Sequence, residues 1–464
     1  MVGGGYCQGC FDKQREIDRL KDDNGRLRDR LRYQERCARA EGFFGSATPS
    51  SKIPVKPNTS PPEPRQRLRG GAKKGHVGHG RKAATKKTAE RVEKIAVPAG
   101  SCPDCGGVLE DRGVRERTVI NCPPVRPVTT VYRLQIKRCP CCRRIFQARA
   151  PSVLPKSLYG NQLLTHIAVQ HYVYGVPLGR LEAQTAIGYG SLIESLHRLG
   201  RLVSAVPPRL REEYRSAPVK HADETGWRTD GKNGYAWLFA TDTLSLFRFR
   251  QTRSATVPQE VFGDKPLPGV LVVDRYNAYN KLPCTLQYCY AHLLREVGDL
   301  GREFEENSEV QAFTTTLAPL LAEAMSLRAL SILDGQFSRQ AATVKQQILA
   351  VANAQAQHPG IHRIQAIFRE HAARVYHWAE DRRVPAENNL AERELRPLVI
   401  ARKVSFGSQS EAGARTREIL MTVLMTLKRR SADFQARFKH ALDELARDAT
   451  RDPYELLFHN HSPP

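Results

Sequence analysis

Residues 219–250 read VKHADETGWRTDGKNGYAWLFATDTLSLFRFR, and this stretch decides the predicted fold. The runs VKHADE, GYAWLFAT and SLFRFR are typical of strands, and TDGKNG and TDT supply turn residues between them. We therefore expect a three-stranded meander. Its first strand carries two neighbouring carboxylates, Asp223 and Glu224. Because side chains alternate along a strand, they should face opposite ways, and we expect a structural role for Glu224.

A second acid ends the next predicted strand. A helix is expected at 254–262, and GVLVVD (269–274) follows it. Consecutive apolar residues that end on an acid suit a buried central strand whose tip opens on a site. Asp223 and Asp274 would then lie on neighbouring strands and could share one cation. A lone aspartate there is more often a cap or turn residue, but the pair favours a functional site.

A third carboxylate is expected on a later helix. The stretch AENNLAERELRPLVIARK (386–403) predicts a helix that begins near Asn388. In that helix Glu392 shares a face with Asn388, while Glu394 points about 160° away from Glu392. The 117 residues between Asp274 and Glu392 are too many for a simple loop, so we expect an all-helical insertion there.

Two CxxC pairs predict a zinc ribbon. The stretches CPDCGG (102–107) and CPCC (139–142) bring two cysteine pairs, with 33 residues between them. Each pair can hold one side of a tetrahedral zinc ion, and the second pair closes the site. One structural Zn²⁺ is therefore expected on Cys102, Cys105, Cys139 and Cys142, with Cys141 as a substitute for Cys142. Four unligated buried thiols are the alternative.

The charge of the chain predicts a polyanionic partner. The 464 residues include 72 Lys and Arg against 48 Asp and Glu, a net charge of +24, and residues 1–100 carry half of it. Such an excess favours binding to nucleic acid over simple solubility. A Pro-, Gly- and Ser-rich linker in the same region cannot bury a core, so its cations are free for DNA phosphates. We expect such contacts from Lys73, Lys74, Arg81 and Lys82.

The N-terminal stretch CFDKQREIDRLKDDNGRLRDRLRYQ (10–34) carries a short heptad pattern. Ile17, Asn24 and Leu31 fall at a positions, and Leu20 and Leu27 fall at d positions. A single Asn at an a position fixes register in a parallel dimer, so we expect a self-pairing zipper and a homo-oligomer. A solvated single helix is the alternative. Whether the nearby Cys7 and Cys10 bind metal stays open.

Neither a secretory signal nor a membrane span is predicted. The first residues lack an apolar core, and no run approaches the roughly 20 apolar residues that a span needs. We therefore expect a cytoplasmic protein without a membrane partner. In a reducing compartment, the 11 cysteines indicate metal ligands or buried thiols more than disulfides.

Three stretches are similar to signature sequences of a known family. HADETGW (221–227), YCYAHLLREV (288–297) and ENNLAERELRPLVIARKVSFGSQSEAG (387–413) resemble those of the IS66 family of bacterial insertion-sequence transposases, which are of the DDE type. The resemblance covers essentially the whole chain. It implies an α/β, RNase H-like catalytic core with a helical insertion, preceded by the zinc ribbon and the coiled-coil helix. Arg275 departs from the pattern, since a small residue is expected there.

The resemblance also implies an activity and its residues. The chain would be a DNA transposase whose catalytic residues Asp223, Asp274 and Glu392 hold two Mg²⁺ ions for strand cleavage and strand transfer. Its partners would be double-stranded DNA at the element ends and the target, a second copy of the chain, and small accessory proteins of the same element. The alternatives are a nuclease or resolvase that does not join DNA, and a DNA-binding regulator derived from a transposase.

Several residues around the third acid are expected to assist. Cations near it are expected to grip flanking phosphates: Arg393, Arg396, Arg402 and Lys403. Asn388 is expected to orient Glu392. His292 forms a CxxH pair with Cys289, and two ligands alone favour packing or substrate positioning over metal binding.

The expected domain order follows from these motifs. It runs from the CxxC and zipper-like helix (1–41) through the basic linker (42–94), the zinc ribbon (95–150), a helical DNA-binding region (151–215) and the catalytic core (216–450), with its insertion at about 296–384, to a C-terminal tail (451–464).

Overall fold

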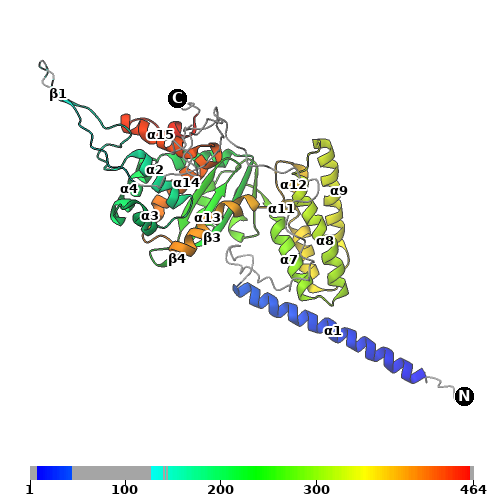
Figure 1. Ribbon diagram of the computed structural model, residues 1–464. Coiled ribbons are helices and arrows are strands. Elements are labelled where there is room, and N and C mark those ends of the chain that lie inside the picture. The colour runs from blue at the N-terminus through cyan, green and yellow to red at the C-terminus, as the bar shows by residue number, and fades with distance from the viewer. Residues whose placement is uncertain (1–7, 44–126, 139, 141, 143–144, 460–464) are drawn as a thin grey trace, which may run out of the picture. The chain divides into compact units, whose positions relative to one another are not determined.

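The computed structural model describes residues 8–43, 127–138, 140, 142 and 145–459. These residues form a mixed α/β fold in which helices pack on both faces of a five-stranded sheet (Figure 1). Among the helices of these ranges, none combines the length and the apolar character needed to cross a membrane.

The sheet has the strand order β5-β4-β3-β6-β7. Its first three strands form the predicted antiparallel meander, and two short strands extend it in parallel with β3: β3 (Val219–Thr229), β4 (Lys232–Ala240), β5 (Ser245–Arg250), β6 (Val270–Val273) and β7 (Thr285–Tyr288). The tight turn from β3 to β4 uses Asp230 and Gly231, with φ of 52° and 71°. Such values at both turn residues are typical of the two-residue hairpin that an Asp-Gly pair favours.

The change from antiparallel to parallel pairing sets the position of the second acid. A parallel neighbour needs a crossover, which the chain makes through α6 (Thr256–Phe262) before β6 begins. β6 is apolar and buried on both sides by its neighbours, as the VLVV sequence predicts. Asp274 follows its last residue directly, so the predicted strand with an acid at its end is confirmed.

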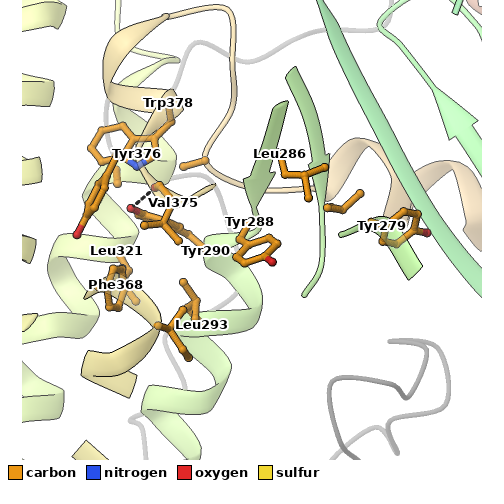
Figure 2. Close-up of a cluster of buried hydrophobic side chains, with 14 of the residues drawn as sticks. Tyr279, Leu286, Tyr288, Tyr290, Leu293, Leu321, Phe368, Val375, Tyr376 and Trp378 are labelled. Carbon is orange, nitrogen blue, oxygen red and sulfur yellow. Dashed lines mark hydrogen bonds between the residues drawn. The ribbon is translucent and has the colours of Figure 1, made fainter. Parts of the chain in front are cut away.

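α6 packs on one face of the sheet, and an all-helical segment follows β7 at the edge of the sheet (Figure 1). That segment consists of α7 (Tyr290–Glu303), α8 (Ser308–Leu327), α9 (Asp334–Asn353), α10 (Pro359–Glu370), α11 (Ala372–Val375) and α12 (His377–Glu380). Figure 2 shows Tyr290 within the aromatic cluster that this segment builds, with its hydroxyl donating to the Val375 carbonyl at 2.6 Å. The helical insertion is therefore present, and the predicted start at 296 falls inside α7.

The other face is covered by helices from both ends of the chain. They are α2 (Asn161–Tyr172), α3 (Leu178–Thr185), α4 (Tyr189–Leu202), α5 (Val206–Ser216), α13 (Asn389–Ser405), α14 (Glu411–Arg430), α15 (Phe434–Arg447) and α16 (Pro453–Phe458). α13 packs on β3 and β4, and α14 packs on β5. The expected C-terminal tail is partly folded, because α16 buries Tyr454, Leu456 and Leu457 in this core.

Two N-terminal features are described in part. α1 (Gln8–Phe43) is a continuous helix, and its expected a and d side chains are exposed: Ile17, Leu20, Leu27 and Leu31. Pairing of this helix stays a prediction. β1 (Ile136–Arg138) pairs in antiparallel register with β2 (Ile145–Gln147), and Cys142 of the second CxxC pair lies in a turn between these strands.

Candidate active site

Asp223 and Asp274 occupy neighbouring positions at adjacent strands of the sheet. In the parallel register His221 pairs with Val272, and two residues further along lie Asp223 on β3 and Asp274 just past β6. Side chains two residues apart share a face, and His221 contacts Asn388 at the start of α13. Asp223 therefore points to the face that α13 covers, and Asp274 lies just beyond the end of the neighbouring strand β6. The predicted proximity of the two acids is seen in the structure.

Both aspartates are buried, with 5% and 8% of their surface exposed, and in the described residues neither forms an ion pair with Lys or Arg. Burial, and then the charges of Glu224, Asp274 and Glu392, raise the pKa of Asp223 well above its usual range. Burial and the Glu224 charge raise the pKa of Asp274 to about 7, against the lowering effects of the Tyr276 N–H and of the Arg253 and Arg275 charges. Each accepts a hydrogen bond from a nearby backbone N–H group: Asp223 from Glu224 at 2.8 Å, and Asp274 from Tyr276 at 3.0 Å. Two buried acids that form no ion pair with Lys or Arg of the described residues therefore stand on neighbouring strands; they are called uncompensated below.

Glu392 lies in the first turn of α13, on the same side of the sheet. Its charge contributes to the raised pKa of Asp223, so the three carboxylates are electrostatically linked. Its side chain, however, faces α7: Oε1 lies 3.9 Å from His292 Nε2, and Oε2 lies 3.6 Å from the Arg295 guanidinium.

Within the described ranges, one group of three metal-ligating side chains has all its ligand atoms within 4.8 Å of one another. It is Cys289, His292 and Glu392, not the predicted triad. Glu392 thus lies on the predicted helix, while its carboxylate is turned toward Cys289 and His292.

The beginning of α13 is fixed by Asn388, which is 1% exposed. Its amide donates to the Ala222 carbonyl at 2.8 Å, its Oδ1 contacts His221 Nδ1 at 2.9 Å, and its backbone N–H donates to Cys289 Sγ at 3.1 Å. Because these contacts tie the start of α13 to β3 and α7, Asn388 sets the position of Glu392 one turn later.

Glu224 lies on the opposite face, as alternation along the strand predicts. It is fully buried and accepts hydrogen bonds from Arg253 Nε at 2.9 Å and from the Tyr279 hydroxyl at 2.6 Å. Arg253 also stacks over the Tyr276 ring, 3.9 Å from its centroid. A paired carboxylate of this kind belongs to the framework of the site, which confirms the structural role expected for Glu224.

Glu394 also points away from Glu392, as the helix register predicts. It accepts a hydrogen bond from Ser245 Oγ at 3.0 Å and pairs with Arg429 of α14 at 2.9 Å. Arg275, which departs from the family pattern, pairs with Glu296 of α7 and so fixes the chain just after Asp274.

The cations predicted on α13 fall into two groups. Arg393, Arg396 and Lys403 are exposed and free to meet a polyanion. Arg402 is half-buried, and its NH1 donates to the Gly226 carbonyl at 2.6 Å and to Thr225 Oγ1 at 3.2 Å. Arg402 therefore also fastens α13 to β3.

Other predicted site residues lie outside the described ranges. They are Lys73, Lys74, Arg81, Lys82, Cys102, Cys105 and Cys139. Cys142 is described and exposed. Sequence reasoning missed the contacts of Arg295 and Arg253, although Arg295 stands three residues after His292 in YCYAHLLREV and could have been placed on the same helix face.

The sequence model of the family described as "Transposase IS66 family" matches residues 156–416, which include the whole sheet, the insertion and α13. The chain belongs to this transposase family.

Two relatives come from Sinorhizobium fredii. The uncharacterized protein y4qI is 27% identical over 411 residues, which cover 78% of this chain and 72% of the relative. The uncharacterized protein y4jD is 23% identical over 395 residues, with 75% of each chain covered.

Proposed function

We propose that this protein is a DDE-type DNA transposase that cleaves element ends and joins them to target DNA, with Asp223, Asp274 and Glu392 as its metal-holding residues. The observation that carries the proposal is the pair of buried aspartates, neither of which forms an ion pair with Lys or Arg of the described residues, in a chain of net charge +24. An uncompensated acidic pair is unfavourable by itself, and a bound divalent cation is its natural partner.

The sheet supports an RNase H-like core. Three antiparallel strands are followed by two parallel ones, and the acids stand on β3 and at the end of β6, while α13 brings the third. The site fits Mg²⁺, which prefers carboxylate oxygens. When bound, the metal would polarise the scissile phosphate and activate the attacking oxygen.

The protein's own groups have separate roles in this proposal. Asp223 and Asp274 supply the fixed negative charge, and Asn388 and Arg402 hold α13 so that Glu392 stays within reach of the aspartates. The exposed Arg393, Arg396 and Lys403 bind DNA backbone near the site. The N-terminal cations add salt-dependent affinity, and a pairing α1, a zinc-bound ribbon and accessory proteins complete the proposed assembly.

The test is incubation of the full-length protein with Mg²⁺ and labelled DNA from both flanks of its coding sequence. Cleaved ends and joined products are then followed together. Joined product supports a transposase, cleavage alone a nuclease or resolvase, and binding without either a regulator. Asp230→Asn is the matched control for Asp223→Asn, because it makes the same chemical change at the exposed end of the same strand and Asn suits that turn.

A further inference from the structure

Cys289, His292 and Glu392 carry an arrangement that the proposed catalytic role does not explain. They come from the first turns of two helices that meet: Cys289 caps α7, His292 stands three residues later, and Glu392 lies in the first turn of α13. A backbone hydrogen bond joins the start of α7 to the residues just before α13, since Tyr290 N–H donates to the Ala386 carbonyl at 2.8 Å. The three side chains are therefore held in one place by the fold.

Two of the polar atoms in this group are buried and have no hydrogen-bond partner in the part of the chain that the structure describes. They are His292 Nδ1 and Glu392 Oε1, although both side chains keep about a fifth of their surface exposed. An unsatisfied buried polar atom costs about 1 to 3 kcal/mol, so the arrangement is unfavourable as it stands. A cation between the side chains would satisfy Glu392 Oε1. It would satisfy His292 Nδ1 as well once the ring turned this nitrogen inward, because Nε2 is the atom that faces Glu392 at 3.9 Å.

The sulfur is surrounded by donors. The backbone N–H of Asn388 points at Cys289 Sγ from 3.1 Å, and the N–H groups of Ala291 and His292 also favour the thiolate. Burial outweighs them and raises the pKa of the Cys289 thiol to about 12, so the thiol keeps its proton until a metal displaces it. His292 is neutral at physiological pH, because burial lowers its pKa to about 4, and neutral imidazole is the form that binds metal.

The spacing and the chemistry of the ligands select a class of metal. A tetrahedral zinc ion with bonds of about 2.0 to 2.3 Å holds its ligand atoms roughly 3.3 to 3.8 Å apart. The atoms of this group lie within 4.8 Å of one another, so small side-chain rotations suffice. Thiolate and imidazole prefer zinc-type transition metals, whereas Mg²⁺ prefers oxygen alone.

We propose that Cys289, His292 and Glu392 bind a zinc-type transition-metal ion, and that this binding withholds Glu392 from Asp223 and Asp274. On binding, the Cys289 thiol loses its proton to solvent, and no oxidation is involved. The second half rests on the proposed function, since it assumes that the aspartates need Glu392. Glu392 would then serve either the zinc-type ion or the Mg²⁺ ion at the aspartates. While the zinc-type ion is bound, the enzyme would be inactive.

The binding half is tested with Co²⁺ as a spectroscopic probe on full-length protein. The difference spectrum between wild type and Cys289→Ser isolates this cysteine, because the predicted ribbon cysteines are the same in both. The expected result is a thiolate–cobalt charge-transfer band that saturates at one ion per chain. His292→Ala and Glu392→Gln should weaken this binding by more than the roughly tenfold that loss of an outer-shell partner costs.

Cys284→Ser is the matched control, because Cys284 is half-buried five residues upstream and should keep the band. A blank difference spectrum, together with unchanged cobalt affinity in Glu392→Gln, overturns the site. If Cys289→Ser does not fold, Glu392→Gln decides alone, since its side chain reaches solvent.

The second half is tested by Zn²⁺ inhibition of Mg²⁺-dependent cleavage, with each protein compared with its own zinc-free activity. Cys289→Ser should need at least about tenfold more Zn²⁺ for half inhibition than wild type. Equal inhibition of both proteins overturns the withholding of Glu392. Absence of cleavage in every protein contradicts the proposed function instead, and the cobalt spectrum still decides whether the site exists.

Discussion

Asp223 and Glu224 are adjacent on β3, yet their carboxylates lie on opposite faces of the sheet in opposite electrostatic surroundings. On the face that α6 covers, Glu224 has an arginine and a tyrosine hydroxyl as partners. Asp223, on the face toward α13, has no such partner among the described residues, and its pKa is raised well above its usual range by burial and by the charges of Glu224, Asp274 and Glu392. One acid is compensated within the fold, and the other is not.

This difference separates stability from function. Removing a partner from a buried ion pair leaves an unpaired charge and costs several kcal/mol. Removing one acid from an uncompensated cluster relieves repulsion instead. If the fold would be more stable without a residue, stability does not explain why the residue is there. Such a residue indicates a functional role.

The largest expected effect is on activity at the uncompensated face. Asp223→Asn and Asp274→Asn should each lower DNA cleavage and joining by about a thousandfold or more, because a metal ligand worth several kcal/mol in the transition state is lost. DNA binding should be nearly unchanged, since it depends on the cationic regions. The double variant should be hardly worse than either single one, because the ligands act as a unit. Gel assays of cleavage, joining and binding measure all three.

Metal-free Asp223→Asn should also unfold at a temperature no lower than wild type. A marked loss of thermal stability in this variant would mean that Asp223 belongs to the framework, like Glu224. Full activity in both aspartate variants would contradict the proposed site.

The next effect concerns the compensated face. Glu224→Gln should lower the free energy of unfolding by about 3 kcal/mol, because Arg253 then keeps its charge without a carboxylate partner. Denaturant unfolding followed by circular dichroism measures this change. Glu296→Gln is the control: its pair with Arg275 is partly exposed, so a loss of at most about 1 kcal/mol is expected. Equal losses in the two variants would remove the distinction between the faces.

A third prediction uses the pKa of Asp274, which burial raises from 3.8 to about 7. The folded protein then binds a proton that the unfolded chain releases, so this group stabilises the fold at low pH and the stability is lost as the pH rises through about 7. Metal-free wild type should therefore lose more stability than Asp274→Asn between about pH 5 and pH 8.

Added Mg²⁺ should stabilise wild type increasingly over the same pH range, because the ionised carboxylate is the form that binds metal. Thermal denaturation with and without Mg²⁺ measures both trends. Parallel pH curves for wild type and Asp274→Asn would show that the pKa of Asp274 is not raised.

The smallest effect is expected from the exposed cations of α13. Arg393→Ala and Arg396→Ala should each weaken DNA binding modestly and reduce the slope of log affinity against log salt by about 0.9, the share of one phosphate contact. Arg302→Ala on α7, where Arg302 pairs with Asp299, is the control and should leave the slope unchanged. An unchanged slope in the α13 variants would place the DNA elsewhere.

The sequence predicted those parts of this structure that depend on local patterns. Alternation along HADETGW placed Asp223 and Glu224 on opposite faces, and helical periodicity separated Glu392 from Glu394, because both rules follow from backbone geometry alone. The apolar run before Asp274 predicted its buried strand and its neighbouring position. These features need no knowledge of distant contacts.

Partners that are distant in sequence could not be predicted in this way. Arg253 meets Glu224 across 29 residues, and His292 meets Glu392 across a helical segment of the insertion. No periodicity links such residues. The sequence therefore indicates only two possible ligands in the CxxH pair, whereas the fold brings Glu392 near them as a third. The folded α16 was also missed, because its short apolar stretch gains stability only by packing on a core made elsewhere.

The junction between Ala386 and Tyr290 has a consequence for how this chain can vary. One hydrogen bond joins the two ends of an inserted segment of 95 residues (291 to 385). The chain therefore leaves the sheet domain and returns to it at a single place. The closure entropy of such a segment grows only slowly with its length, so its helices can be lengthened, shortened or exchanged with little change at the point of attachment. The insertion is thus open to evolutionary replacement, while the few residues at its base are not, since they are also the neighbours of Glu392.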